Sequence, residues 1–120
     1  MPYTVREHDR AQVLMIKGRF LGSIERDALT QTFDDLKAAG SVKLVIDLSK
    51  TDFMDSTGVG LIVRGAEMLR EAGGDVCLAG LQTRVKNLFL MSRLLGTLFQ
   101  DYPTAEAALQ SFAAPPAVDL

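Results

Sequence analysis

The chain has 120 residues, of which 48% are hydrophobic and 23% charged, with a formal net charge of −2. This composition can build the core of one domain without a metal or disulfide, and it excludes the basic footprint of a nucleic-acid-binding protein or a polybasic membrane patch. No apolar run reaches the roughly 18 residues that a membrane span requires, and the N-terminus lacks an apolar signal core. We therefore expect a cytoplasmic protein that binds no nucleic acid and is not inserted into a membrane.

The first 18 residues predict a hairpin. Residues 3–7 and the apolar run 12–17 are expected to be strands, with a polar turn at residues 8–10 between them and Gly18 after the second.

A first helix is predicted from Ser23, which offers an N-cap, to Gly40, which ends it. The residues expected to face the core recur at helical spacing: Ile24, Ala28, Leu29, Phe33 and Leu36.

The middle of the chain predicts a buried strand, a loop and a second helix. Residues 42–48 are β-branched and nearly all apolar, which is typical of an interior strand of a parallel sheet. Residues 49–55 are predicted to form a polar loop, and a helix is expected from Ser56 to the Gly73-Gly74 pair.

The remaining elements are shorter. Residues 75–79 and 97–102 are expected to be strands, and a last helix is expected to open at Pro103-Thr104 and run to Phe112. Between these strands Thr83 is expected to cap a third helix, whose inward side chains are predicted to be Val85, Leu88, Phe89 and Met91. We predict one domain over residues 1–112 and a flexible tail over residues 113–120.

Strands that alternate with helices predict a single α/β domain, in which a mixed, mostly parallel sheet of about five strands packs with about four helices. Loops that leave parallel strands emerge at one edge of the sheet, where open α/β sheets bind their ligands. Residues 19–23, 49–56 and 80–84 should therefore lie together, with Ser56 at the centre.

Catalytic constellations are sparse in this sequence. His8 is the only histidine, is expected in the first turn, and would lie at the edge of the sheet opposite Ser56, so neither a zinc site nor a Ser-His-Asp triad is predicted. Gly58-Val59-Gly60 lacks the rest of a phosphate-loop or dinucleotide fingerprint, and close helix packing explains it better. We expect no enzyme activity, no metal site and no cofactor.

Three carboxylates, Asp47, Asp52 and Asp55, gather near the predicted edge. A cation site or an acid catalyst is conceivable there, but the end of a strand, a turn and a helix cap explain these residues more simply. Cys77, the only cysteine, is expected to be a buried strand residue.

Ser56 stands where the predicted loop meets the second helix, and either Ser56 or Asp55 could be the N-cap. A phosphate on Ser56 would meet free N–H groups and the positive end of the helix dipole. It would also add about −1.5 to −2 of charge beside Asp52 and Asp55, which a bound partner would have to bury or repel.

The motif around this serine resembles a known family. Residues 44–49 (Leu-Val-Ile-Asp-Leu-Ser) followed by residues 53–60 (Phe-Met-Asp-Ser-Thr-Gly-Val-Gly) are similar to the signature of the STAS domain, found in SpoIIAA-like bacterial anti-sigma factor antagonists. The resemblance runs from about residue 3 to residue 112.

This resemblance implies a partner-switching protein whose phosphoacceptor is Ser56, with Thr57 as a second candidate. The unphosphorylated form would bind an anti-sigma factor that is also a serine kinase of the histidine-kinase-like ATPase fold, and a PP2C-type phosphatase would reverse the phosphorylation. ATP would belong to the kinase. The residues expected to contact the partner are Arg19, Phe20, Leu21, Asp52, Phe53, Met54, Asp55, Thr57, Gly58 and Arg84.

One stretch departs from the family pattern. Many antagonists have Gly-Glu-Leu-Asp after the second strand, whereas this chain has residues 18–22, Gly-Arg-Phe-Leu-Gly, so an acidic contact is replaced by Arg19 and Phe20. Arg19 could be a partner contact or a solvated loop residue. This departure also leaves open an alternative, a STAS scaffold subunit of a lipid-transport or stress-sensing complex in which Ser56 is not phosphorylated.

Overall fold

The computed structural model describes residues 3–8, 11–40 and 42–113. Its elements alternate much as the sequence predicts. In chain order they are β1 (Tyr3–His8), β2 (Ala11–Phe20), α1 (Gly22–Ala38), β3 (Lys43–Met54), α2 (Ser56–Glu71), β4 (Asp75–Ala79), α3 (Thr83–Met91), β5 (Asp101–Tyr102) and α4 (Ala105–Ala113).

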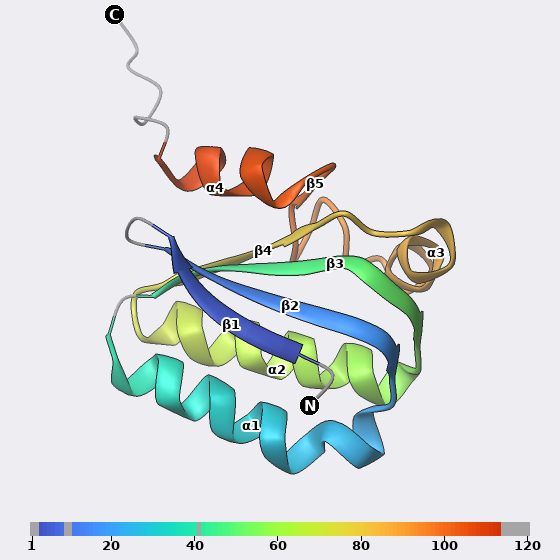
Figure 1. Cartoon of the computed structure of the whole chain (residues 1–120), viewed down its shortest axis with the longest axis horizontal. Coiled ribbons are helices and arrows are strands. Elements are labelled where there is room, and N and C mark those ends of the chain that lie inside the picture. The colour runs from blue at the N-terminus through green and yellow to red at the C-terminus, as the bar shows by residue number, and fades with distance from the viewer. Residues whose placement is uncertain (1–2, 9–10, 41, 114–120) are drawn as a thin grey trace, which may run out of the picture.

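The five strands form one sheet in the order β1-β2-β3-β4-β5. β1 and β2 are the antiparallel hairpin that was expected, and every other neighbouring pair is parallel. Helices α1 and α2 lie side by side against one face of the sheet, α4 lies over the other face, and α3 lies at one end (Figure 1). The predicted fold class is confirmed.

Alternation along β3 explains the two layers of helices. Leu44, Ile46 and Leu48 point to the face covered by α1 and α2 and belong to the larger core. Val45 points to the other face, where a smaller cluster includes Ala105 and Ala108 of α4. An interior strand covered on both faces must be nearly continuously apolar, as this one is.

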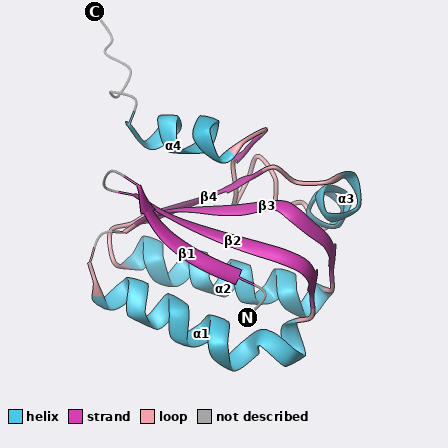
Figure 2. Cartoon of the chain, viewed as in Figure 1, coloured by secondary structure: helices cyan, strands magenta, loops and turns pink. Residues whose placement is uncertain are grey.

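The prediction of a loop over residues 49–55 is wrong for residues 49–54, because β3 runs from Lys43 to Met54. Figure 2 shows β3 as one long strand. Two register shifts between β2 and β3 interrupt the alternation of side chains in this stretch. Its sequence therefore lacks the apolar–polar alternation that predicts a strand. Inside it, the buried Thr51 hydroxyl donates a 2.7 Å hydrogen bond to the Ile16 carbonyl of β2. Residues 49–54 are therefore part of the sheet.

Other boundaries also differ from the predictions. The first helix begins at Gly22 with Leu21 as N-cap, two residues before the predicted Ser23 cap. Ile24 and Met91 were expected to face the core, but they are 71% and 82% exposed. The predicted strand at residues 97–102 is reduced to the two residues of β5.

At the ends of the chain, His8 is the last residue of β1 and pairs with Ala11, whereas the sequence suggested a turn. Helix α4 extends to Ala113. The tail predicted for residues 113–120 otherwise lies outside the described residues.

Candidate functional site

The carboxyl ends of β2, β3 and β4 lie at one edge of the sheet, because these strands are mutually parallel. Both long helices begin at that edge, on the right in Figure 1. The three segments expected to meet there do lie together, because Gly22 contacts Asp55 and Thr57, and Gln82 contacts Ser49.

Asp55 organises this edge. It is the N-cap of α2, and its Oδ1 accepts a 2.7 Å hydrogen bond from the backbone N–H of Gly58. The same oxygen accepts a 3.0 Å hydrogen bond from the N–H of Gly22, the first residue of α1. One carboxylate thus satisfies free N–H groups at two helix starts, which decides between Ser56 and Asp55 as the cap.

Gly22 allows the two helix starts to touch. A Cβ atom on Gly22 would come within 2.7 Å of Thr57 Cγ2, closer than real contacts allow. Gly22 was not among the predicted site residues, although a glycine directly before an amphipathic helix was the available signal. Thr57 is half-buried.

Ser56 is the first residue of α2 and is exposed. The hydrogen bonds from Gly58 and Gly22 to the Asp55 carboxylate fix the backbone next to Ser56. Ser56 is therefore held on rigid backbone at the N-terminus of a helix of 16 residues. A phosphate placed there would be electrostatically favoured by the helix dipole.

Arg19 and Phe53 are paired across β2 and β3, three residues before the first residues of α1 and α2 respectively. The Arg19 guanidinium carbon lies 5.0 Å from the centroid of the Phe53 ring, a cation–π contact. Arg19 is exposed, while Phe53 is half-buried. At the position that departs from the family pattern, an arginine stacked on an aromatic ring therefore lies close to the exposed Asp52 and the Asp55 cap.

Three predicted contact residues lie beneath this surface instead of on it. Phe20 has no exposed area, Met54 is 5% exposed, and Gly58 is buried against both of them. In this conformation the Phe20 and Met54 side chains pack beneath the start of α2, against Gly58. Leu21 is half-buried and Asp52 is exposed.

The loop after β4 completes the edge. Gln82 donates a 3.0 Å hydrogen bond to the Ser49 carbonyl, and Gly80, at φ +68°, packs so closely on Ser49 that a Cβ would lie 2.7 Å from its side chain. Arg84 is exposed in the first turn of α3, at the same edge.

The other candidate groups have structural roles. Asp47 is 5% exposed, and its Oδ1 accepts a 3.0 Å hydrogen bond from the N–H of Ser49. Within residues 3–8, 11–40 and 42–113, no group of His, Cys, Asp and Glu side chains is arranged to hold a metal ion. Cys77 is buried, and burial, reinforced by the nearby Asp75 charge, raises the pKa of its thiol to about 12.

Among the helices of the described chain, none combines the length and the apolar character needed to cross a membrane.

A family model and a curated relative match this chain. The model of the STAS domain family matches residues 3–108. BtrV of Bordetella bronchiseptica, a candidate anti-sigma factor antagonist, is 30% identical over 73 residues, which are 61% of this chain and 62% of that protein.

Two solved structures illustrate the shared fold. An anti-sigma factor antagonist from Mycobacterium paratuberculosis is 29% identical, with a TM-score of 0.73 and 93% of each chain covered. The anti-sigma factor antagonist SpoIIAA in its unphosphorylated form is 18% identical, with a TM-score of 0.67, and the alignment covers 92% of this chain and 96% of SpoIIAA.

Proposed function

This chain belongs to the STAS domain family, and we propose that it is an anti-sigma factor antagonist whose binding to its partner is switched off by phosphorylation of Ser56. The observation that carries the proposal is the exposed Ser56 at the first position of α2, next to a helix cap that fixes its backbone. The chain acts by binding, without catalysis, in the cytoplasm.

The partner of the unphosphorylated form is an anti-sigma factor with serine kinase activity and the histidine-kinase-like ATPase fold. Such a kinase brings its own ATP, so this chain supplies the substrate hydroxyl and a docking surface. The contact surface consists of the exposed and half-buried residues around Ser56, namely Arg19, Leu21, Asp52, Phe53, Asp55, Thr57 and Arg84. Thr57 is a second acceptor candidate, although its half-buried side chain is less accessible to a kinase.

Phosphorylation releases the partner by electrostatics. A phosphate adds about −1.5 to −2 charge beside Asp55 and the exposed Asp52. A partner packed against this surface would leave that charge poorly paired, at a cost of several kcal/mol, and each 1.4 kcal/mol is about tenfold in affinity. The domain itself need not refold, because the helix N-terminus accommodates the phosphate. A PP2C-type phosphatase restores the binding form.

Affinity capture from the native cells, followed by mass spectrometry, tests the proposal. We expect a histidine-kinase-like ATPase in the captured material and phosphate on Ser56 in a fraction of the protein. An unmodified Ser56 accompanied by subunits of a membrane transporter would favour the second candidate, a scaffold role, for which the replacement of an acidic family residue by Arg19 is the motivating observation.

A further inference from the structure

The start of α1 has no side-chain cap of its own. Leu21 stands at the N-cap position in extended backbone, and its apolar side chain forms no capping hydrogen bond. The N–H of the next residue, Gly22, instead donates a 3.0 Å hydrogen bond to Asp55 Oδ1, which is 33 positions away in the sequence. Since the same oxygen caps α2, the position of one helix start depends on that of the other.

The first turn of α2 fills the space that a side chain at position 22 would need. A Cβ atom on Gly22 would overlap the backbone nitrogen of Gly58 and would lie 2.5 Å from the carbonyl carbon of Thr57. These atoms belong to the backbone, so they cannot rotate away as the end of a side chain could. Any residue larger than glycine must therefore displace the turn that begins with Ser56.

Ser56 lies between two residues that contact α1. Asp55, directly before it, accepts the hydrogen bond from Gly22, and Thr57, directly after it, packs against the same glycine. The backbone of Ser56 is therefore tied to α1 on both sides, while its side chain is exposed. The Cα atom of Ser56 has a fixed position relative to both helices, and only rotation about the Cα–Cβ bond is left to the hydroxyl group.

We propose that Gly22 is a positioning residue for the phosphorylation of Ser56, because it holds the first turn of α2 where the kinase requires the acceptor hydroxyl. This inference rests on the proposed function and adds to it a residue outside the motif. In the transfer, Ser56 Oγ forms a bond to the γ-phosphorus of ATP held by the kinase, and the bond from that phosphorus to the β–γ bridging oxygen breaks. ADP leaves, and the hydroxyl proton passes to a base of the kinase. Gly22 touches none of these atoms.

Misplacement of the acceptor hydroxyl should appear in kcat. A shift of about 1 Å in a reacting group can cost about 100-fold in rate, whereas docking also uses exposed side chains outside α2, such as Arg19 and Asp52. The probe is the histidine-kinase-like ATPase captured with the wild-type chain, used at saturating ATP. For Gly22→Ala we expect kcat to fall about tenfold or more and KM to change less than about threefold.

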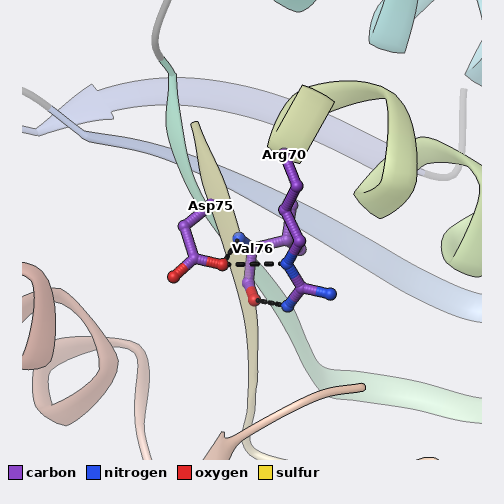
Figure 3. Close-up of polar contacts among 3 residues, drawn as sticks. All are labelled: Arg70, Asp75 and Val76. Atoms are coloured by element: carbon purple, nitrogen blue, oxygen red, sulfur yellow. Dashed lines mark hydrogen bonds and ion pairs between the residues drawn. The ribbon is translucent and has the colours of Figure 1, made fainter. Parts of the chain in front are cut away.

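Two matched variants separate positioning from stability. Gly60→Ala adds the same methyl group to α2, where a Cβ meets nothing within 4 Å, and should keep the wild-type kcat. Asp75→Ala removes a carboxylate that, like the cap of α2, accepts two hydrogen bonds with one oxygen: from Arg70 Nε at 3.0 Å and from the N–H of Val76 at 2.8 Å (Figure 3). Asp75 begins β4, at the end of the strand away from the phosphorylation site, so its loss should lower stability and leave kcat unchanged.

Asp55→Ser is the substitute if Gly22→Ala does not fold. Serine is a favoured N-cap, but its side chain is one bond shorter than that of aspartate and serves only the local cap, so the link to α1 is lost. We expect the same fall in kcat as for Gly22→Ala. Asp55→Asn keeps an oxygen at the position of the carboxylate, and its kcat should exceed that of Asp55→Ser at least about fivefold.

The outcomes separate this inference from the proposed function. Folded Gly22→Ala and Asp55→Ser proteins with the wild-type kcat would overturn the inference and leave the switch at Ser56 intact. A loss confined to KM would also overturn it, because Gly22 would then support docking and not the position of the acceptor. If the wild-type chain captures no such kinase, or mass spectrometry finds no phosphate on Ser56 after the reaction, the proposed function fails and the inference fails with it.

Discussion

The carboxylate of Asp55 accepts hydrogen bonds from Gly58 in its own helix and from Gly22 at the start of α1, at 2.7 and 3.0 Å. This bridge ties two helix N-termini to the carboxyl end of β3. It places Ser56 on backbone that a local cap and a distant helix hold together, which is the preformed surface that the proposed switch requires.

Asp55→Ala should lower the free energy of unfolding by about 1–2 kcal/mol or slightly more, since it removes a helix cap and also orphans the Gly22 N–H. Urea denaturation followed by circular dichroism measures this loss. Asp55→Asn keeps an acceptor oxygen and should lose less. Asp52→Ala, a neighbouring exposed carboxylate, should stay within about 0.5 kcal/mol of wild type. Equal losses in Asp55→Ala and Asp52→Ala would refute the bridging role.

Two glycines of α2 should respond oppositely to alanine. A Cβ on Gly65 would clash with the ring of Phe33 in α1, so Gly65→Ala should destabilise the fold by about 1–3 kcal/mol. A Cβ on Gly60 meets nothing within 4 Å, so the close helix packing predicted for this glycine is wrong. Gly60→Ala should stabilise the fold by about 0.5–1 kcal/mol through helix propensity. Thermal unfolding of both variants checks this, and a loss of stability in Gly60→Ala would show that the helix packing is misjudged.

The Arg19–Phe53 contact should be measurable as a coupling energy. A double-mutant cycle with Arg19→Ala and Phe53→Leu is expected to give about 0.5–1 kcal/mol, the range for an exposed cation–π pair. The single variants should remain folded. A coupling indistinguishable from zero would mean that the Arg19–Phe53 contact does not stabilise the fold.

Cys77 should make the protein less stable at high pH. Its folded-state pKa is raised from 9.0 to about 12, so above pH 9 the unfolded state loses the thiol proton while the folded state keeps it. Stability is therefore lost as pH rises from 9 towards 12, by about 1.4 kcal/mol at pH 10. Relative to Cys77→Ala, wild type should show this extra loss in urea denaturation between pH 8 and pH 10. Parallel profiles for the two proteins would contradict it.

The sequence predicts the order of elements and the edge that carries the site, because apolar periodicity and the parallel crossover rule act locally and do not depend on details of packing. It does not predict that residues 49–54 continue β3, since the register shifts with β2 hide the alternation. It also does not predict that Ile24 is exposed: that residue lies on the helical stripe, but one turn before the part of α1 that packs on the core.

Within the site, the motif identifies Ser56 and Asp55, but not their surroundings. The Asp55–Gly22 bond joins residues 33 positions apart, and the stacking of Arg19 on Phe53 depends on the register of two strands. Phe20 was expected to be a contact residue because of its place in the loop, and it is buried because β2 continues to that position. Such long-range relationships come from tertiary packing, which single-residue patterns do not encode.

Isothermal titration calorimetry with the captured kinase tests the central claim most directly. It compares the affinity of the kinase for unmodified protein with its affinity for protein that carries phosphoserine at position 56. Ser56→Ala serves as the matched control for loss of the hydroxyl. The account predicts that unmodified protein and Ser56→Ala bind comparably, and that phosphorylation weakens binding by about 100-fold or more, which corresponds to at least about 2.8 kcal/mol. Equal affinity of the phosphorylated and unmodified proteins would contradict it.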